Sequence, residues 1–273
     1  MLSQKDINRL QGKRLFLLDM DGTIYLGDRL FDGTKELLNY IHSVGGTYYF
    51  FSNNSSRGTE QYIEKLRKMG ISSSPADYIT SVDALIEYLK ETDPEGKRKC
   101  YVCGTVSFLS SLREAGINVT AEPEKDVSTL ILGYDTELTY QKLRDCCVLL
   151  RRNTEYIATH PDMVCPDPDG PMPDCGSVIE MLDTACQRRP EIIGKPKPYM
   201  VDLALKRTGF SKEETILLGD RIYTDIACGI HAGIDTLFLL TGESTREDIE
   251  RFQMVPSFIF EDLNSLCKIL KQP

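Results

Sequence analysis

The sequence predicts an α/β fold, with a doubly wound parallel sheet as its core and a second α/β domain inserted into that core. Short apolar runs alternate with amphipathic helical stretches, and one connection between two such runs is much longer than the others. Continuous apolar runs are typical of strands buried on both faces, as in parallel sheets. Their alternation with helices is typical of doubly wound folds. The chain of 273 residues is long enough for two modest domains.

Four apolar runs each lead to a polar residue, and these runs are the expected core strands. They are residues 15–18 before Asp19, 48–51 before Ser52, 192–193 before Lys195 (through Gly194) and 216–218 before Asp220 (through Gly219). The stretch after Ser52 has the periodicity of a helix, since Tyr62, Leu66 and Met69 share one face. Ligands of doubly wound sheets bind beyond the carboxyl ends of the strands. We therefore expect the four polar residues to lie at one edge of the core sheet.

The long connection indicates an inserted domain. It spans 143 positions from Ser52 to Lys195, against 33 from Asp19 to Ser52 and 25 from Lys195 to Asp220. A single strand-helix-strand unit needs only about 30 residues. The insertion carries its own expected elements: strands near 99–103, 128–133 and 155–159, and helices near 82–91, 106–115, 140–152 and 177–188. We expect residues 81–183 to form the second domain, and 1–80 with 184–273 to form the core.

Composition and charge exclude several classes of function. The net charge of −9 argues against a general nucleic-acid surface. There is no apolar run of the roughly 20 residues that a membrane span needs, and the polar first ten residues do not resemble a secretion signal. The nine cysteines follow no disulfide-scaffold spacing, so we expect a reducing, cytoplasmic location. Cys100 and Cys103 have no second pair or histidine at metal-ligand spacing, and we interpret them as buried structural thiols.

The segment Asp19-Met20-Asp21-Gly22-Thr23 directly follows a predicted strand. Carboxylates two residues apart on an extended chain point to the same side, where their charges repel. A hard divalent cation such as Mg²⁺ relieves this repulsion, because it takes oxygen ligands and commonly shares them with a phosphate. Asp220 and Asp225 add carboxylates from another strand end. The sequence therefore predicts a magnesium site.

Lys195 and Ser52 complete a set of groups suited to phosphoryl transfer. Lys195 supplies a compact positive charge, while Ser52 and Asn53 supply neutral donors ahead of a helix whose N-terminus favours an anion. Phosphoryl transfer requires in-line attack and neutralisation of charge on the equatorial oxygens. A carboxylate nucleophile would divide the displacement into two easier steps. Taken singly, Asp21-Gly22 could be a simple turn, the sequence around Lys195 a surface turn, and Ser52 a residue that begins a helix.

Four motifs in this order resemble those of the haloacid dehalogenase superfamily: DMDGT, SNNSS, GKPKP and GDRIYTD. The insertion between the second and third motifs resembles the C2-type cap of the NagD-like and 4-nitrophenylphosphatase-like enzymes, whose core is Rossmann-like. The resemblance covers nearly the whole chain. It implies a phosphatase that hydrolyses small phosphate monoesters.

The resemblance also implies roles for individual residues. Asp19 would be the nucleophile, and Asp21 would act as general acid and then as general base. Ser52 and Asn53 would bind the phosphoryl group, and Lys195 would balance its charge.

The same resemblance implies four aspartates at the Mg²⁺ site. Asp19 and Asp220 would bind the ion through their carboxylates, and Asp21 through its backbone carbonyl. Asp225 would act through metal-bound water or by orienting the lysine.

The segment 156–176 is rich in Pro, Gly and Asp, and we expect a loop over the site. His160, Asp162 and residues 133–135 are candidates for contact with the substrate, although for His160 we favour the interpretation of a loop histidine with satisfied hydrogen bonds. The expected partner is a small phosphorylated metabolite such as a sugar phosphate, a nucleoside monophosphate, pyridoxal phosphate or phosphoglycolate. The sequence does not determine oligomeric state and leaves a homodimer open.

Two rival functions stay open at this point. The first is a phosphotransferase or mutase that uses the same aspartyl phosphate. The carboxyl of Asp21 could activate water, which favours hydrolysis. The second is a non-catalytic sensor of a phosphorylated metabolite. The intact set of Asp19, Asp21, Lys195 and Asp220 argues against a sensor, because binding alone needs no nucleophile.

Overall fold

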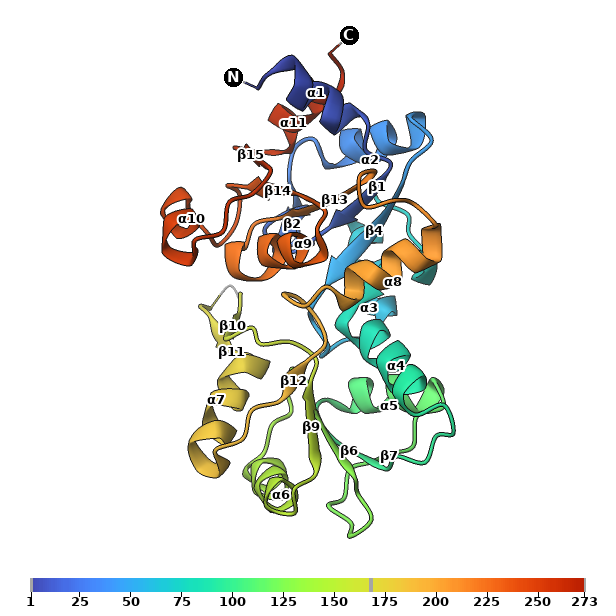
Figure 1. The fold of residues 1–273 in the computed structure, drawn as a ribbon, viewed down its shortest axis with the longest axis vertical. Helices are drawn as coiled ribbons and strands as arrows, with labels where there is room; N and C mark the ends of the chain where they lie inside the picture. The colour runs from blue at the N-terminus through green and yellow to red at the C-terminus, as the bar shows by residue number, and fades with distance from the viewer. Residues whose placement is uncertain (1, 167–168, 273) are drawn as a thin grey trace. The chain divides into compact units, whose positions relative to one another are not determined.

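The computed structural model describes residues 2–166 and 169–272, and its chain divides into two compact units (Figure 1). The first unit contains the described parts of residues 1–52, 62–79 and 196–273. The second contains those of residues 53–61 and 80–195. An α/β fold with an inserted second unit is confirmed.

The first unit is built on a six-stranded sheet with the order β15-β14-β13-β1-β4-β5. The central pairs β1–β4, β1–β13, β13–β14 and β14–β15 are all parallel. The strands are β1 (Leu15–Leu18), β4 (Thr47–Ser52), β5 (Tyr78–Thr80), β13 (Thr215–Gly219), β14 (Asp235–Leu239) and β15 (Phe258–Phe260). A small antiparallel hairpin, β2 (Tyr25–Leu26) and β3 (Arg29–Leu30), follows β1.

Helices cover both faces of this sheet, because alternate side chains of its buried strands point to opposite sides. Phe16 and Leu18 of β1 belong to a core that also contains Leu37 and Leu266 from the helices on one side. The helices and helical turns of this unit are α1 (Gln4–Gln11), α2 (Thr34–Ser43), η1 (Pro75–Asp77), α8 (Tyr199–Thr208), η2 (Ile222–Ile226), α9 (Ala227–Ala232), α10 (Arg246–Phe252) and α11 (Leu263–Leu270). Helix α3 (Thr59–Lys68) begins in the second unit and continues in the first. The doubly wound core predicted from the apolar runs is confirmed.

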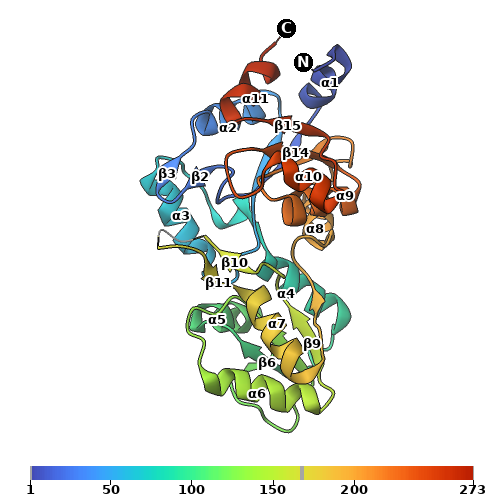
Figure 2. The same ribbon diagram turned by 90° about the vertical axis from the view of Figure 1, so that its left-hand side faces the viewer.

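The second unit has its own five-stranded parallel sheet, with the order β12-β9-β8-β6-β7. Its strands are β6 (Cys100–Cys103), β7 (Val119–Thr120), β8 (Thr129–Leu132), β9 (Glu155–Ala158) and β12 (Glu191–Ile192). Its helices are α4 (Ser81–Thr92), α5 (Val106–Glu114), α6 (Tyr140–Arg151) and α7 (Cys175–Cys186). Helices α6 and α7 lie side by side (Figure 2). The three strands and four helices predicted for the insertion are all present.

One predicted core strand belongs to the second unit instead. Residues 192–193 were expected to enter the core sheet, but Ile192 ends β12, which pairs in parallel with β9. The apolar pattern predicts a buried strand correctly but does not reveal which sheet the strand joins. As a result the second unit extends to Lys195, beyond the expected boundary at residue 183.

The segment 156–176 contains more regular structure than the expected loop. It begins inside β9, contains the short antiparallel hairpin of β10 (Val164–Cys165) and β11 (Met172–Pro173), and ends inside α7. Residues 167 and 168 of this segment lie outside the described residues.

The nine cysteines are free, and Cys100 and Cys103 are buried as predicted. Burial raises the pKa of the Cys100 thiol to about 12, which keeps it protonated and unreactive at neutral pH. Within residues 2–166 and 169–272, no helix combines the length and the hydropathy that crossing a bilayer requires.

Candidate active site

Three aspartates from distant parts of the sequence meet at the edge of the core sheet. Asp19 follows β1, Asp220 follows β13, and Asp225 lies in η2. One carboxylate oxygen of each lies within 4.8 Å of the others. β1 and β13 are neighbouring strands, and the Asp19 N–H donates to the carbonyl of Leu218 at 3.0 Å. The strand pairing therefore brings two of the three carboxylates together.

The protein holds these carboxylates with backbone and hydroxyl donors. Asp220 accepts a hydrogen bond from the N–H of Glu243 at 2.8 Å and one from the hydroxyl of Thr23 at 3.3 Å. Asp225 accepts from the N–H of Arg221 at 3.1 Å, across the single π-helical turn η2. Turns of this kind are frequent at functional sites, because they shift a side chain out of the regular helical position.

Gly22 allows the chain after β1 to pass close to Asp220. Its φ of +87° lies in the left-handed region that favours glycine. A Cβ at this position would lie 2.5 Å from Oδ2 of Asp220. The DMDGT motif therefore requires glycine for conformation and for space.

The residues present fit a divalent cation. Asp220 and Asp225 are buried and Asp19 is half-buried, so three negative charges would repel one another strongly in a poorly solvated place. A cation removes this cost, and a donor set made only of oxygen suits a hard ion. The carboxylates of Asp19, Asp220 and Asp225, which the sequence placed at a metal site, thus lie close together.

The side chain of Asp21 turns to different partners. Oδ2 accepts a hydrogen bond from the Tyr25 hydroxyl at 3.1 Å, and Oδ1 lies 3.7 Å from Nζ of Lys65. The ammonium of Lys65 also lies 3.9 Å from the centre of the Tyr25 ring. Burial and the charge of Asp21 raise the pKa of Tyr25, so its hydroxyl stays protonated and can only donate to the carboxylate. The sequence indicates Asp21 but gives no signal for Tyr25, which lies in an apolar stretch, or for Lys65, which lies on a charged helix.

Ser52 is the last residue of a first-unit segment, and Asn53 is the first residue of the second unit. Ser52 ends β4, the other neighbour of β1, so it shares the sheet edge with Asp19. The amide of Asn53 pairs with the backbone of Lys195: its Oδ1 accepts from the Lys195 N–H at 2.8 Å, and its Nδ2 donates to the Lys195 carbonyl at 3.0 Å. Lys195 is 2% exposed and belongs to the second unit.

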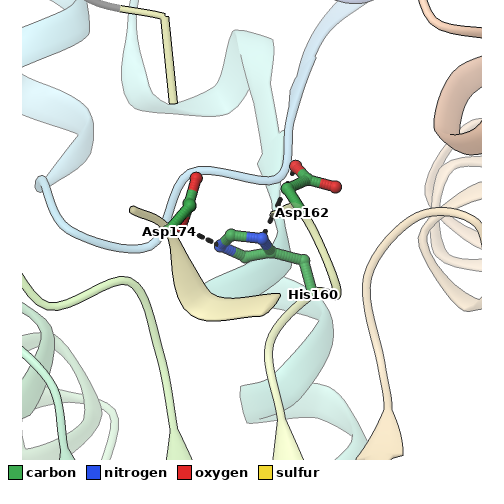
Figure 3. Close-up of side chains that lie close together, drawn as sticks. All are labelled: His160, Asp162 and Asp174. Carbon is green, nitrogen blue, oxygen red and sulfur yellow. Dashed lines mark ion pairs between the residues drawn. The ribbon is translucent and has the colours of Figure 1, made fainter. Parts of the chain in front are cut away.

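The candidates His160 and Asp162 belong to a buried cluster in the second unit. The imidazole of His160 lies between the carboxylates of Asp162 and Asp174, with one ring nitrogen directed toward each (Figure 3). Asp162 also accepts from Nδ2 of Asn53 at 3.2 Å. Sequence analysis missed Asp174, because nothing distinguishes it from the other aspartates of its Pro- and Asp-rich segment.

Comparison with known proteins supports a family assignment. A haloacid dehalogenase-like hydrolase model matches residues 16–118, and a second HAD-hydrolase-like model matches residues 192–266. The acid sugar phosphatase of Staphylococcus aureus is 34% identical over 259 residues, which cover 95% of this chain and 98% of the relative. The chain belongs to the haloacid dehalogenase-like hydrolases.

Solved structures place this haloacid dehalogenase-like hydrolase in the NagD-like group. A 4-nitrophenylphosphatase from Thermotoga maritima is 38% identical, with a TM-score of 0.89 over 96% of this chain and 99% of that one. A structure assigned to NagD is 36% identical, with a TM-score of 0.86 and coverage of 96% and 99%. A p-nitrophenyl phosphatase from Archaeoglobus fulgidus is 27% identical, with a TM-score of 0.85 and coverage of 94% and 98%. These likenesses confirm the fold and the subfamily that the four motifs predicted.

Proposed function

We propose that this hydrolase is a Mg²⁺-dependent phosphatase that cleaves small phosphate monoesters through an aspartyl phosphate on Asp19. The enzyme is a hydrolase that acts on phosphate monoesters. The observation that carries the mechanism is the convergence of Asp19, Asp220 and Asp225 at one sheet edge, with an oxygen of each within 4.8 Å of the others. This arrangement combines a nucleophile with the residues that would hold a cation beside it.

The reaction proceeds in two displacements. A carboxylate oxygen of Asp19 attacks phosphorus in line, the bond from phosphorus to the ester oxygen breaks, and Asp21 gives a proton to the departing alkoxide. Asp21, now ionised, takes a proton from water, whose oxygen attacks the acyl phosphate. Phosphate leaves, and the Asp19 carboxylate is restored with Asp21 protonated again. The hydroxyl of Tyr25 and the ammonium of Lys65 orient the Asp21 carboxyl for both transfers.

Lys195 would balance charge on the phosphoryl oxygens, and a bound metal ion would add to this effect. Asp19, Asp220 and Asp225 would hold Mg²⁺, together with the backbone carbonyl of Asp21. Bound there, the ion would neutralise negative charge that builds up during transfer. Lys195 supplies a second positive charge, and Ser52 a hydroxyl donor, to the same group.

The substrates are small phosphate monoesters, among them sugar phosphates. The names of two relatives, acid sugar phosphatase and 4-nitrophenylphosphatase, support this range. We also propose a cytosolic location, which the free thiols of the nine cysteines support.

The test compares Asp19→Asn with Asp28→Asn in a panel of phosphorylated metabolites and 4-nitrophenyl phosphate. Asp28 is an exposed aspartate in the turn of the β2–β3 hairpin, so its variant controls for the loss of one charge. We expect the wild type and Asp28→Asn to release phosphate with Mg²⁺, and Asp19→Asn to release none while remaining folded. Beryllium fluoride, an acyl-phosphate mimic, should bind to Asp19. Phosphate release by Asp19→Asn at the wild-type rate would exclude Asp19 as the nucleophile.

A further inference from the structure

The buried cluster around His160 places one imidazole between two carboxylates. Nδ1 lies 3.5 Å from Oδ2 of Asp162, and Nε2 lies 3.7 Å from Oδ1 of Asp174. The His160 side chain is completely buried, and neither ring nitrogen has a hydrogen-bond partner among the described residues. Asp162 and Asp174 are each 5% exposed. An imidazole in this position cannot exchange its partners for water.

The charge of the ring follows from the chemistry of its two neighbours. A neutral imidazole carries one N–H and one lone pair, so one of its nitrogens would present a lone pair to a carboxylate. A protonated imidazole carries an N–H on both nitrogens, so it presents positive charge to both carboxylates and can form an ion pair with each. The other titratable group beside the ring is the Cys175 thiol, whose pKa is raised by burial and by Asp174, so it contributes no charge at neutral pH.

A metal ion accounts for the geometry less well. The two nitrogens of an imidazole ring point apart, and each faces a different carboxylate (Figure 3). An ion bound to one nitrogen would leave the other still directed at a carboxylate. One ring nitrogen and one carboxylate oxygen of each aspartate nevertheless lie within 4.8 Å of one another, so addition of Zn²⁺ distinguishes a metal site from an imidazolium.

The cluster is connected to Lys195 through Asn53. Nδ2 of Asn53 donates to both carboxylate oxygens of Asp162, at 3.2 and 3.3 Å, and to the Lys195 carbonyl at 3.0 Å. Oδ1 of the same amide accepts from the Lys195 N–H at 2.8 Å. Because Asp162 can only accept from Nδ2, it helps to orient the Asn53 amide so that Oδ1 meets the Lys195 N–H and Nδ2 meets the Lys195 carbonyl. A shift of Asp162 would therefore move the side chain of Asn53, and through it the backbone of Lys195.

We propose that His160 is an imidazolium cation that acts as a positioning residue: it fixes Asp162, which orients Asn53 and so sets the position of Lys195. This role rests on the proposed function, in which Lys195 balances charge on the phosphoryl group. This role takes the place of the direct substrate contact that the sequence suggested, because the ring of His160 is completely buried. Asp174 is the second anion that keeps the ring charged.

The charge of His160 can be measured without any substrate. The chain has three histidines, and His42 and His231 are both exposed. In protein labelled with ¹⁵N-histidine at pH 8, we expect both ring nitrogens of His160 to have the shifts of protonated nitrogen, whereas exposed imidazoles are neutral there. In Asp174→Asn the His160 signals should move to those of a neutral ring. A neutral His160 in the wild type, or a stoichiometric change of its shifts on addition of Zn²⁺, would overturn the proposal.

Kinetics of His160→Gln test the positioning role, with His42→Asn as the matched control. We expect kcat for 4-nitrophenyl phosphate to fall about 10- to 100-fold in His160→Gln, with a smaller change in KM, because misplaced charge affects the transition state more than binding. Asp174→Asn should lose activity in the same way, and Asp174→Glu, which keeps the charge, should recover part of it. His42→Asn should match the wild type.

The two proposals fail separately. One outcome is an active wild type together with the same kcat for His160→Gln, Asp174→Asn and the control His42→Asn. In that case the positioning role is wrong, and the proposed phosphatase activity is still supported. If the wild type releases no phosphate from any ester, the proposed function is wrong, and so is the catalytic purpose of the cluster. The nitrogen shifts then still decide the charge of His160.

Discussion

Replacing Gly22 with alanine should separate the cost to stability from the cost to catalysis. The new side chain would stand at φ +87°, which costs about 1–2 kcal/mol of folding free energy. Its Cβ would lie 2.5 Å from Oδ2 of Asp220, so the carboxylate must move about 0.9 Å to reach the 3.4 Å of an ordinary contact. A displacement near 1 Å in a catalytic constellation costs about 100-fold in rate. We expect Gly22→Ala to be modestly less stable and to lose about 100-fold in kcat/KM.

The matched control is Gly27→Ala, in the exposed turn between β2 and β3. Gly27 also has a positive φ, of +57°, but nothing lies within 4 Å of the position its Cβ would take. Both variants should unfold at a denaturant concentration slightly below that of the wild type, and only Gly22→Ala should be slow in phosphate release from 4-nitrophenyl phosphate with excess Mg²⁺. Equal activity of the two variants would show that the close approach of Gly22 to Asp220 has no part in catalysis.

Three further predictions concern the metal, the core and the pH dependence of stability. Chelation of the metal should abolish phosphate release. Asp220→Asn should raise the Mg²⁺ concentration that gives half-maximal activity more than tenfold, and an unchanged Mg²⁺ concentration would show that Asp220 is not a ligand. Leu217→Ala truncates a completely buried side chain of β13 and should lower the free energy of unfolding by about 2–5 kcal/mol, measured with a denaturant. A loss below about 1 kcal/mol would contradict the burial of Leu217 in the core. Although burial opposes ionisation, ion pairs with Lys13 and Arg9 hold the pKa of Asp235 below its ordinary value of 3.8. Because the pKa is lowered on folding, this carboxylate stabilises the protein above about pH 4 and ceases to do so as pH falls through the folded pKa. Asp235→Asn should therefore cost about 3–5 kcal/mol at pH 7, with a difference from the wild type that shrinks in acid.

The core and its carboxylates were predictable because local pattern determines them. The apolar runs before Asp19 and Asp220 are strands buried on both faces, and parallel pairing of neighbouring strands brings their ends together. The spacing of Asp225 from Asp220 predicted a nearby carboxylate, and the π-helical turn supplies the geometry.

What the sequence could not show depends on contacts between distant segments. Ile192 has the same apolar character in either sheet, and its pairing with β9 follows from three-dimensional packing. Asp174 resembles its acidic neighbours until α7 places it 3.7 Å from a buried imidazole. Lys65 lies on a charged helix, and only the fold directs it toward Asp21 and Tyr25.

The pairing of Asn53 with Lys195 has an evolutionary consequence. The two residues stand at places where the chain passes from one unit to the other, and their hydrogen bonds lie wholly within the second unit. A recombination event that exchanged residues 53–195 for another insert would therefore carry the lysine away with the old insert and leave the three carboxylates behind. For the proposed phosphatase, a functional replacement would have to supply its own cation.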